Sequence, residues 1–269
     1  MGYAMRMTAM GHRQLHTPSS ADGAILDIAL HSNGLRQVLV QPAQRSPIET
    51  TFLFKVRVAD TDGHRGAASM LIEQRYRWRG YAVDHKNTER PDSITLCASN
   101  ATQVLGTVTV GLDGASGLLC EATYPHEVAR LRVPGARLCE LTRFAIDQTE
   151  LNKQVMAALL HIAYLYAYVV SESTTLLIEV NPRHVGYYTK ALGFAVVGSE
   201  RNCERAAAPS VLLSLPLTKV RALIRKYGGQ QGYGSAKNLY TYCFSEQEET
   251  GILGRILAIN GASRKHSLG

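Results

Sequence analysis

Two stretches of the sequence decide the fold: LCELTRFAID, from Leu138 to Asp147, and LLIEVNPRHVGYYTKALGF, from Leu176 to Phe194. Each has the pattern of an apolar strand that runs into a helix. Between them, Val155 to Val170 (VMAALLHIAYLYAYVV) predicts one long apolar helix. Because a helix that joins two strands is the usual crossover between parallel neighbours, we expect the two stretches to form adjacent parallel strands.

Two parallel strands that diverge at one end leave backbone N–H and C=O groups unpaired. Such groups can hold an extended arm rich in amides, such as phosphopantetheine, by strand-like pairing. The two stretches therefore indicate a cleft for acyl transfer. The alternative is that they form an ordinary strand–helix–strand unit without a site.

The rest of the chain alternates between strand and helix patterns. We expect strands at residues 51–58, 94–98, 104–110, 194–197 and 211–215, and helices at 65–79, 125–131, 185–192 and 218–226. This order predicts an α/β fold of a mixed, α+β-like kind, in which a central mixed sheet carries helices on both faces.

The sequence predicts that the chain has three parts. Residues 1–47 form an N-terminal extension with Pro, Ser and Gly punctuation, in which 24–30 and 35–40 could each form a short element. Residues 48–217 form the domain that contains both deciding stretches. Residues 218–269 form a C-terminal extension that is helical or irregular.

Charge points to the class of partner. The 269-residue chain has a net charge of +7 and a pI near 9.2, which favours an acidic partner: nucleic acid, an anionic membrane or an acidic protein. Nucleic acid is the weakest of these, because the basic clusters largely lack interleaved aromatic residues and no helix-turn-helix, zinc-finger or RNA-binding signature accompanies them.

Other sequence signals indicate a cytoplasmic protein without a metal. The five cysteines form no C-x-x-C pair, which fits a reducing compartment, and the first twenty residues contain no apolar export region. The helix Val155–Val170 is shorter than the roughly 20 residues of a membrane span, so we expect it to be buried and expect no transmembrane segment. One H-x-x-x-H spacing, His12 with His16, lacks the Glu of a zinc-protease motif.

Several motifs resemble one branch of the acetyltransferase (GNAT) fold. ELTRFAI at Glu140–Ile146 resembles the E-x-S/T-R-F/L-A-V strand of acyl-homoserine-lactone synthases and of FeeM-type N-acyl amino acid synthases. Asn181-Pro182, Tyr187-Tyr188 and Leu192-Gly193-Phe194 resemble the GNAT segment in which a helix ends at Gly-Phe before the next strand. Arg75-Tyr76 and Arg79-Gly80-Tyr81 resemble the first-helix pattern of the FeeM-type group. The resemblance covers about residues 50 to 216.

The resemblance implies an N-acyltransferase that moves a fatty acyl chain from acyl carrier protein to the amine of an amino acid. The donor is then acyl-phosphopantetheine on the carrier, and no cofactor is bound permanently. One departure agrees with this: residues 147–152 (DQTELN) lack the glycines with which coenzyme A-dependent relatives grip pyrophosphate and contain two acids instead. The alternatives are an acyl-homoserine-lactone synthase-like enzyme, which uses S-adenosylmethionine, and a non-catalytic module that binds acyl chains or the carrier.

Two residues are the catalytic candidates. N-acylation requires a group that removes a proton from the amine and an acid that protonates the departing thiolate. Glu140 is the candidate base, and its alternative role is structural, as an ion pair or a buried polar contact. Tyr188 is the candidate acid, with Tyr187 beside it, and an interior packing role is the alternative for either tyrosine.

Six residues are the candidates for substrate binding. Arg75 and Arg143 could each hold the carboxylate of an amino acid, although Arg75 could equally be a surface residue and Arg143 could instead organise an acidic neighbour. Three residues after Glu140 on a strand, Arg143 is expected to project from the opposite face. Tyr81 follows the first helix, on which Trp78 is expected in the core. The backbone N–H groups of Phe144, Ala145 and Ile146 are candidate oxyanion donors.

Basic residues supply the candidates for carrier docking. They are Arg130, Arg132, Arg137, Arg221 and Arg225. Their positive charge would suit an acidic carrier, and the alternative is an ordinary solvated face.

Overall fold

This computed structural model describes residues 24–30, 36–39, 51–82, 90–147, 152–230 and 238–266. They build one nine-stranded sheet in the order β2-β1-β3-β4-β5-β6-β7-β9-β8. The strands are β1 (Ala24–Leu30), β2 (Arg36–Leu39), β3 (Thr51–Val58), β4 (Ser93–Ser99), β5 (Val104–Leu112), β6 (Leu138–Ile146), β7 (Thr175–Val180), β8 (Ala195–Cys203) and β9 (Ala208–Pro216).

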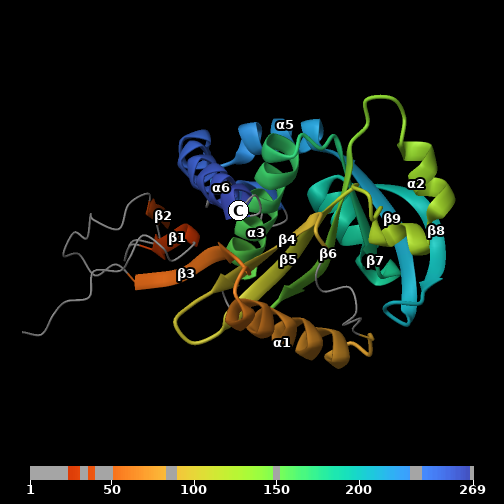
Figure 1. Ribbon diagram of the computed structural model, residues 1–269, viewed down its shortest axis with the longest axis horizontal. Helices are drawn as coiled ribbons and strands as arrows, with labels where there is room; N and C mark the ends of the chain where they lie inside the picture. The colour runs from red at the N-terminus through yellow and green to blue at the C-terminus, as the bar shows by residue number, and fades with distance from the viewer. Residues whose placement is uncertain are drawn as a thin grey trace, which may run out of the picture.

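Helices connect and cover these strands. They are α1 (Asp62–Trp78), η1 (Leu119–Ala122), α2 (Pro125–Leu131), α3 (Asn152–Tyr164), η2 (Leu165–Val170), α4 (Pro182–Tyr187), η3 (Tyr188–Leu192), α5 (Leu217–Tyr227), η4 (Leu239–Tyr242) and α6 (Glu246–His266). Helix α1 lies against one face of the sheet, and α3, α5 and α6 lie on the other (Figure 1). The predicted mixed α/β sheet with helices on both faces is therefore confirmed.

The two deciding stretches form the only parallel pair among the described strands, β6 and β7. The predicted crossover helix between them is α3 continued by the π-helix η2. An 18-residue window of it, Lys153–Val170, is long and apolar enough to cross a membrane, but 56% of that window is buried inside the fold. The side chains of Val155, Leu159 and Ile162 pack into the main core.

The predicted N-terminal extension contributes to the same sheet. Strands β1 and β2 occupy the two short elements expected there, and β1 pairs antiparallel with β3. Ile25 on β1 is buried in the main core. The remaining residues before β3 lie outside the described part of the chain, and the division into three domains stays a prediction.

A bulge interrupts β6 next to Arg143. Thr109 on β5 pairs with Thr142, and Thr107 pairs with Ala145, so β6 carries one residue more than β5 over this interval. Arg143 has φ of +50°, and the Thr107 hydroxyl donates to its carbonyl at 2.9 Å. An extra residue reverses the alternation of side chains beyond it.

The result of the bulge is visible in the packing. Leu141 before it and Phe144 and Ile146 after it all pack against the α3 core, although their numbers differ in parity. Ala145 packs on the other face, against Leu71 and Ile72 of α1.

Gly193 ends the helix that precedes β8. Its φ is +81°, in the left-handed region, and its N–H bonds the Tyr188 carbonyl. We expect Gly193→Ala to lower the free energy of unfolding by about 1–2 kcal/mol, because a Cβ is unfavourable in that region. Gly186→Ala within α4 is the matched control, because open space surrounds its Cβ position and alanine favours the helix. Urea titrations that showed equal stability for both variants would contradict the prediction.

Candidate active site

The site is the place where β6 and β7 diverge. Their pairing joins Leu138–Leu141 to Thr175–Ile178 and extends no further along either strand. The predicted splay is therefore confirmed. A cavity of about 480 Å³ occupies this place.

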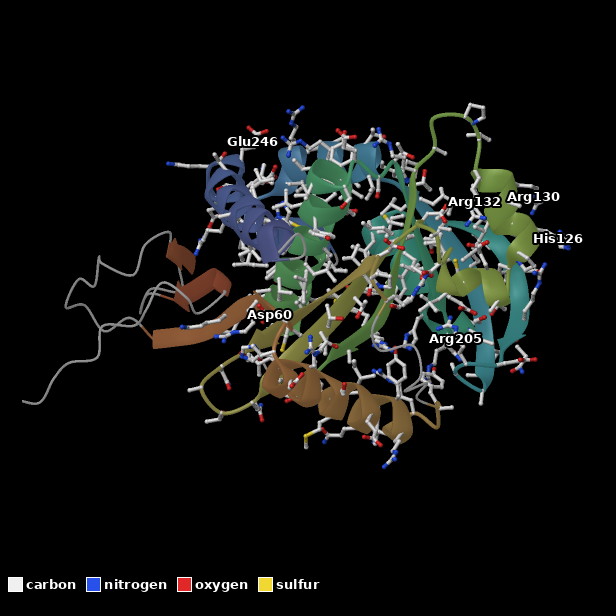
Figure 2. All side chains as sticks on the ribbon, viewed as in Figure 1. Asp60, His126, Arg130, Arg132, Arg205 and Glu246 are labelled. Atoms are coloured by element: carbon white, nitrogen blue, oxygen red, sulfur yellow. The ribbon has the colours of Figure 1, made fainter. Side chains whose placement is uncertain are left out.

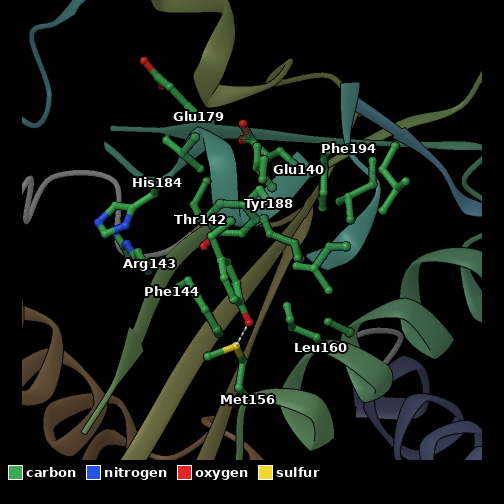
Figure 3. Close-up of a pocket in the computed structure, with 18 of the residues that line it drawn as sticks. Glu140, Thr142, Arg143, Phe144, Met156, Leu160, Glu179, His184, Tyr188 and Phe194 are labelled. Carbon is green, nitrogen blue, oxygen red and sulfur yellow. Dashed lines mark hydrogen bonds between the residues drawn. The ribbon is translucent and has the colours of Figure 1, made fainter. Parts of the chain in front are cut away.

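The cavity passes from one face of the sheet to the other. Glu140 lies opposite Leu177 on β7, so Glu140 and Glu179 project from the same face by alternation. Leu176 and Ile178 project from the other face, toward α3. All four line the cavity, which therefore has a polar half with two carboxylates and an apolar half (Figure 3).

Glu140 is buried, and its side chain is 2% exposed. Its oxygens accept the N–H groups of Leu119 at 2.6 Å and Cys120 at 3.0 Å, and Arg90 donates to Oε1 at 3.3 Å. Burial raises the pKa of Glu140 above the ordinary value, against the opposing effect of the two backbone bonds. The carboxylate thus fixes η1 and also faces the cavity, and the base role stays a prediction.

A second carboxylate, Glu179, was not among the expected site residues. It accepts bonds from Arg205 at 2.6 Å and from the Ser210 hydroxyl at 2.8 Å, and all three residues line the cavity. Arg205 Nε is buried and has no hydrogen-bond partner. Arg205 lies between β8 and β9, so only the fold brings it to β7. The sequence feature that could have predicted Glu179 as a site residue is its position at the end of a strand that was expected to be parallel to the strand of Glu140.

The expectation that Arg143 projects away from Glu140's face is corrected by the bulge. The extra residue in β6 breaks the simple alternation: Leu141 and Phe144 share the α3 face, which leaves Thr142 and Arg143 between them to the opposite face, from which Glu140 projects. Arg143 also lies close enough to Tyr76 to lower that hydroxyl's pKa, although burial, the larger effect, leaves the pKa of Tyr76 raised. Arg143 is thus a positive group in the polar half.

Tyrosines surround the divergence of the two strands. Tyr188 lines the cavity, and burial, followed by the neighbouring Tyr187 and Tyr76, raises its pKa. It therefore holds its proton at neutral pH. The Tyr187 hydroxyl donates to the Met156 sulfur at 3.2 Å, the contact dashed in Figure 3. This contact joins α4 to α3 beside the cavity.

The other substrate-binding candidates divide into two groups. Tyr81, Phe144 and Ile146 line the cavity, whereas Arg75 and Ala145 do not. The Arg75 guanidinium pairs with Asp147, whereas Tyr76 on α1 and Arg79 just beyond its end line the cavity; a substrate-binding role for Arg75 stays a prediction. The side chain of Ala145 packs beneath α1.

Two further expectations concern residues beside the site. Trp78 was expected in the core, but it is 69% exposed at the end of α1. Residues 148–151, in which the sequence lacks a pyrophosphate-binding glycine pattern, lie outside the described residues. In the part of the chain that the structure describes, no three His, Cys, Asp or Glu side chains gather as metal ligands do.

The five docking arginines all have acidic partners. Arg130 lies near Glu127, Arg132 near Asp113 and Glu121, Arg137 near Glu172, Arg221 near Glu249 and Arg225 near Glu246. Arg130 and Arg132 belong to the α2 region (Figure 2), and none of the five lines the cavity. Their docking role stays a prediction, but these carboxylates offset much of their charge.

Different arginines lie at the exposed border of the cavity, which we call its mouth: Arg183 is exposed and contacts Tyr81 and His184, two residues of the lining. Arg79 lines the cavity, and Arg183 donates to the Tyr81 hydroxyl at 2.5 Å. Both arginines lower the pKa of His184, although its burial does so more, so their charges act at one place. Over the described residues, no carboxylate forms a salt bridge with either arginine.

Comparisons with known proteins gave similar solved structures and one family match. The solved structure of FeeM, an N-acyl amino acid synthase from uncultured soil microbes, is similar over 63% of this chain and 93% of that one, with 26% identity and a TM-score of 0.59. The acyl-homoserine-lactone (AHL) synthase LasI matches over 61% and 90%, with 16% identity and a TM-score of 0.45. An N-acetyltransferase from Staphylococcus aureus Mu50 matches over 62% and 99%, with 13% identity and a TM-score of 0.43.

A search of curated protein sequences gave no match. The fold is GNAT-like, and the predicted N-acyltransferase class is confirmed. The family model described as N-acyl amino acid synthase FeeM matches residues 67–216, more than half of the chain, and the chain therefore belongs to the FeeM family of N-acyl amino acid synthases.

Proposed function

We propose that this protein transfers a fatty acyl chain from the phosphopantetheine thiol of acyl carrier protein to the α-amine of an amino acid. The observation that carries the proposal is the cavity through the sheet, with charged groups in one half and an apolar second half. A fatty chain suits the apolar half, and an amino acid suits the polar half. The thioester carbon then lies between them, where β6 and β7 diverge.

The donor arm would pair with the backbone of β6 and β7 beyond Leu141 and Ile178, where the two strands no longer pair with each other. Backbone N–H groups of Phe144 to Ile146 are the candidate donors to the thioester oxygen as it gains charge. Pairing of the arm with the main chain of the strands does not require a pyrophosphate-binding site. The arm of a carrier and the arm of coenzyme A therefore share this part of the site.

The reaction then needs no covalent enzyme intermediate. The neutral amine attacks the thioester carbon, the new C–N bond forms, and a proton on nitrogen passes to Glu140 directly or through water. The C–S bond breaks, and the thiolate takes the proton of Tyr188, whose raised pKa keeps it protonated until then. The products are the amide and the free thiol of the carrier, and Glu140 returns its proton to solvent while Tyr188 regains one.

The acceptor carboxylate would be held by Arg143 and Arg205. Both line the polar half, and the buried Nε of Arg205 offers a donor without a partner. Glu179 and Ser210 orient the Arg205 side chain. A planar guanidinium suits a carboxylate because it donates two parallel hydrogen bonds.

The acidic carrier would dock at the mouth, on Arg79 and Arg183 beside the exposed Trp78. We expect Arg183→Glu to raise the KM for the carrier-linked donor about 10-fold or more at low salt, because reversing a charge opposes an acidic partner. Arg130→Glu is the control: it makes the same charge change on α2, away from the mouth, at a side chain that is 73% exposed. Equal KM values for both variants would count against docking at the mouth.

One assay tests the proposed function. Acyl carrier protein loaded with a long acyl chain is incubated with the protein and the standard amino acids, and N-acyl products are sought by mass spectrometry. Inactivity with every amino acid would refute the proposal. Adding S-adenosylmethionine tests the homoserine-lactone alternative, and the same chain on coenzyme A tests whether the carrier is required. Cytoplasmic location stays a prediction.

A further inference from the structure

We propose that the C-terminal segment of this chain forms the inner wall of the acyl site and sets the length of the chain that it accepts. The segment comprises α5, η4 and α6. This inference rests on the proposed function, because it treats the apolar half of the cavity as the acyl site. It concerns residues beyond 216, where the match to the FeeM family ends.

Side chains from α5, from η4 and from the residue that follows η4 line the cavity directly. They are Leu217, Val220, Ile224, Leu239, Tyr240 and Cys243. All six are buried and belong to the main core. The C-terminal segment is therefore part of the cavity wall rather than an appendage outside it.

The register of the strands shows how deep this wall lies. The cavity is lined by Val180 near the divergence and by Leu176 nearer the start of β7, four residues away, or about 13 Å along a strand. Leu215 of β9 pairs with Leu176, and the N–H of Leu217 bonds the Thr174 carbonyl at 2.9 Å. Leu217 thus lies at the inner end, where a chain that enters at the divergence meets α5.

Small side chains on the crossover helix leave space for that chain. Ala157 and Ala163 on α3 and Ala167 on η2 line the cavity. Val220 and Ile224 on α5 line the same cavity. The terminal methyl group of the acyl chain would therefore contact residues of α5.

Buried hydrogen bonds hold the wall in place. His161 on α3 is 1% exposed, and its Nδ1 accepts the N–H of Phe244 at 3.0 Å. The proton of a neutral His161 then lies on Nε2, which donates to Glu249 on α6 at 3.2 Å. Arg221 of α5 also pairs with Glu249, and Tyr240 donates to the Leu192 carbonyl at 2.9 Å.

A wall held rigidly in this way selects acyl chains by the volume that they occupy. Protein interiors are close-packed, so a larger side chain excludes the last carbons of a long substrate and a smaller one admits more. Discrimination by one methylene in an apolar pocket is at least about 10-fold. The identity of residues 220 and 224 should therefore decide the preferred chain length.

The test uses two opposite substitutions and a control. Ile224→Ala should move the preferred acyl chain to longer donors and Val220→Phe to shorter ones, each changing the ratio of kcat/KM values for long and short acyl-carrier donors about 10-fold. Ile252→Ala is the control, since Ile252 on α6 is equally buried in the core but does not line the cavity. Its length preference should equal that of the unmodified protein.

A second readout is independent of turnover. Fatty acids of increasing chain length are used to displace a fluorescent fatty acid from each variant, which measures the length preference in binding. Circular dichroism checks that each variant is folded. Unchanged length preference in both variants, by turnover and by displacement, would overturn the inference while the proposed function stood. Absence of N-acyl product from the unmodified protein, with displacement that still shifts with residues 220 and 224, would refute the proposed function alone.

Discussion

Glu140→Gln should lower kcat about 100- to 10,000-fold and change the KM for the amino acid little, because an amide cannot take the amine proton. The substitution keeps the volume of the side chain and the position of its carbonyl oxygen. Oε1, which accepts from Leu119 and Arg90, can be replaced by that oxygen, whereas an amide nitrogen would face the N–H of Cys120. Steady-state rates with acyl carrier protein as donor check the result.

The pH profile separates catalysis from structure. Burial holds the pKa of Glu140 above its ordinary value of 4.5, and a base must be deprotonated to act. The kcat/KM of the unmodified protein should therefore rise with pH through a value above 4.5 and reach its plateau only beyond it. In Glu140→Gln this limb should be absent.

Glu121→Gln is the matched control for the same experiment. Glu121 accepts the N–H of Leu118 at 2.7 Å and so also holds η1, but it does not line the cavity. Its variant should keep both kcat and the acidic limb. If the two variants lost activity equally and both kept the limb, Glu140 would be a structural residue that positions η1.

Leu159→Ala should give the largest loss of stability, about 2–5 kcal/mol in the free energy of unfolding. Leu159 is 0% exposed in the middle of α3, and its methyl group lies against the space above Gly106 on β5. Truncation loses buried apolar area and leaves a void between helix and sheet. Urea or thermal denaturation measures the change.

The exposed Leu257 on α6 supplies the control for this truncation. It is 52% exposed, so Leu257→Ala should change the stability by no more than about 0.5 kcal/mol. Because Leu159 does not line the cavity, the acyl-length preference of Leu159→Ala should remain that of the unmodified protein. A loss below 1 kcal/mol would mean that α3 relaxes into the space and is not fixed against β5.

The elements of the fold could be predicted because their signals are local. The residues of β3 alternate, the crossover helix is apolar throughout, and Gly193 follows the last residue of η3. The parallel pairing of β6 with β7 also followed from the order of strand, helix and strand. These features depend on residues that are close in sequence, and the local sequence pattern therefore predicts them.

The site itself was predicted only in part, because it depends on distant contacts and on one irregularity. Nothing in ELTRFAI marks the bulge at Arg143, which arises from pairing with β5. Arg205 reaches Glu179 from the connection between β8 and β9, 26 residues along the chain. Trp78 has a large apolar side chain of the kind usually found in a core, but its place at the end of α1 leaves it exposed.

The bulge in β6 also makes the number of residues between Leu141 and Phe144 a functional quantity. Deleting one of them would place Phe144 two residues after Leu141, so that regular pleating would keep both on the α3 face, but only one side chain instead of two, Thr142 and Arg143, would remain between them to line the cavity. Regular pairing at the present length would instead turn Phe144 and Ile146 to the face under α1. The bulge therefore lets β6 present one more side chain to the cavity than a regular strand would, and substitutions at Thr142 or Arg143 can alter that lining while Phe144 keeps its place.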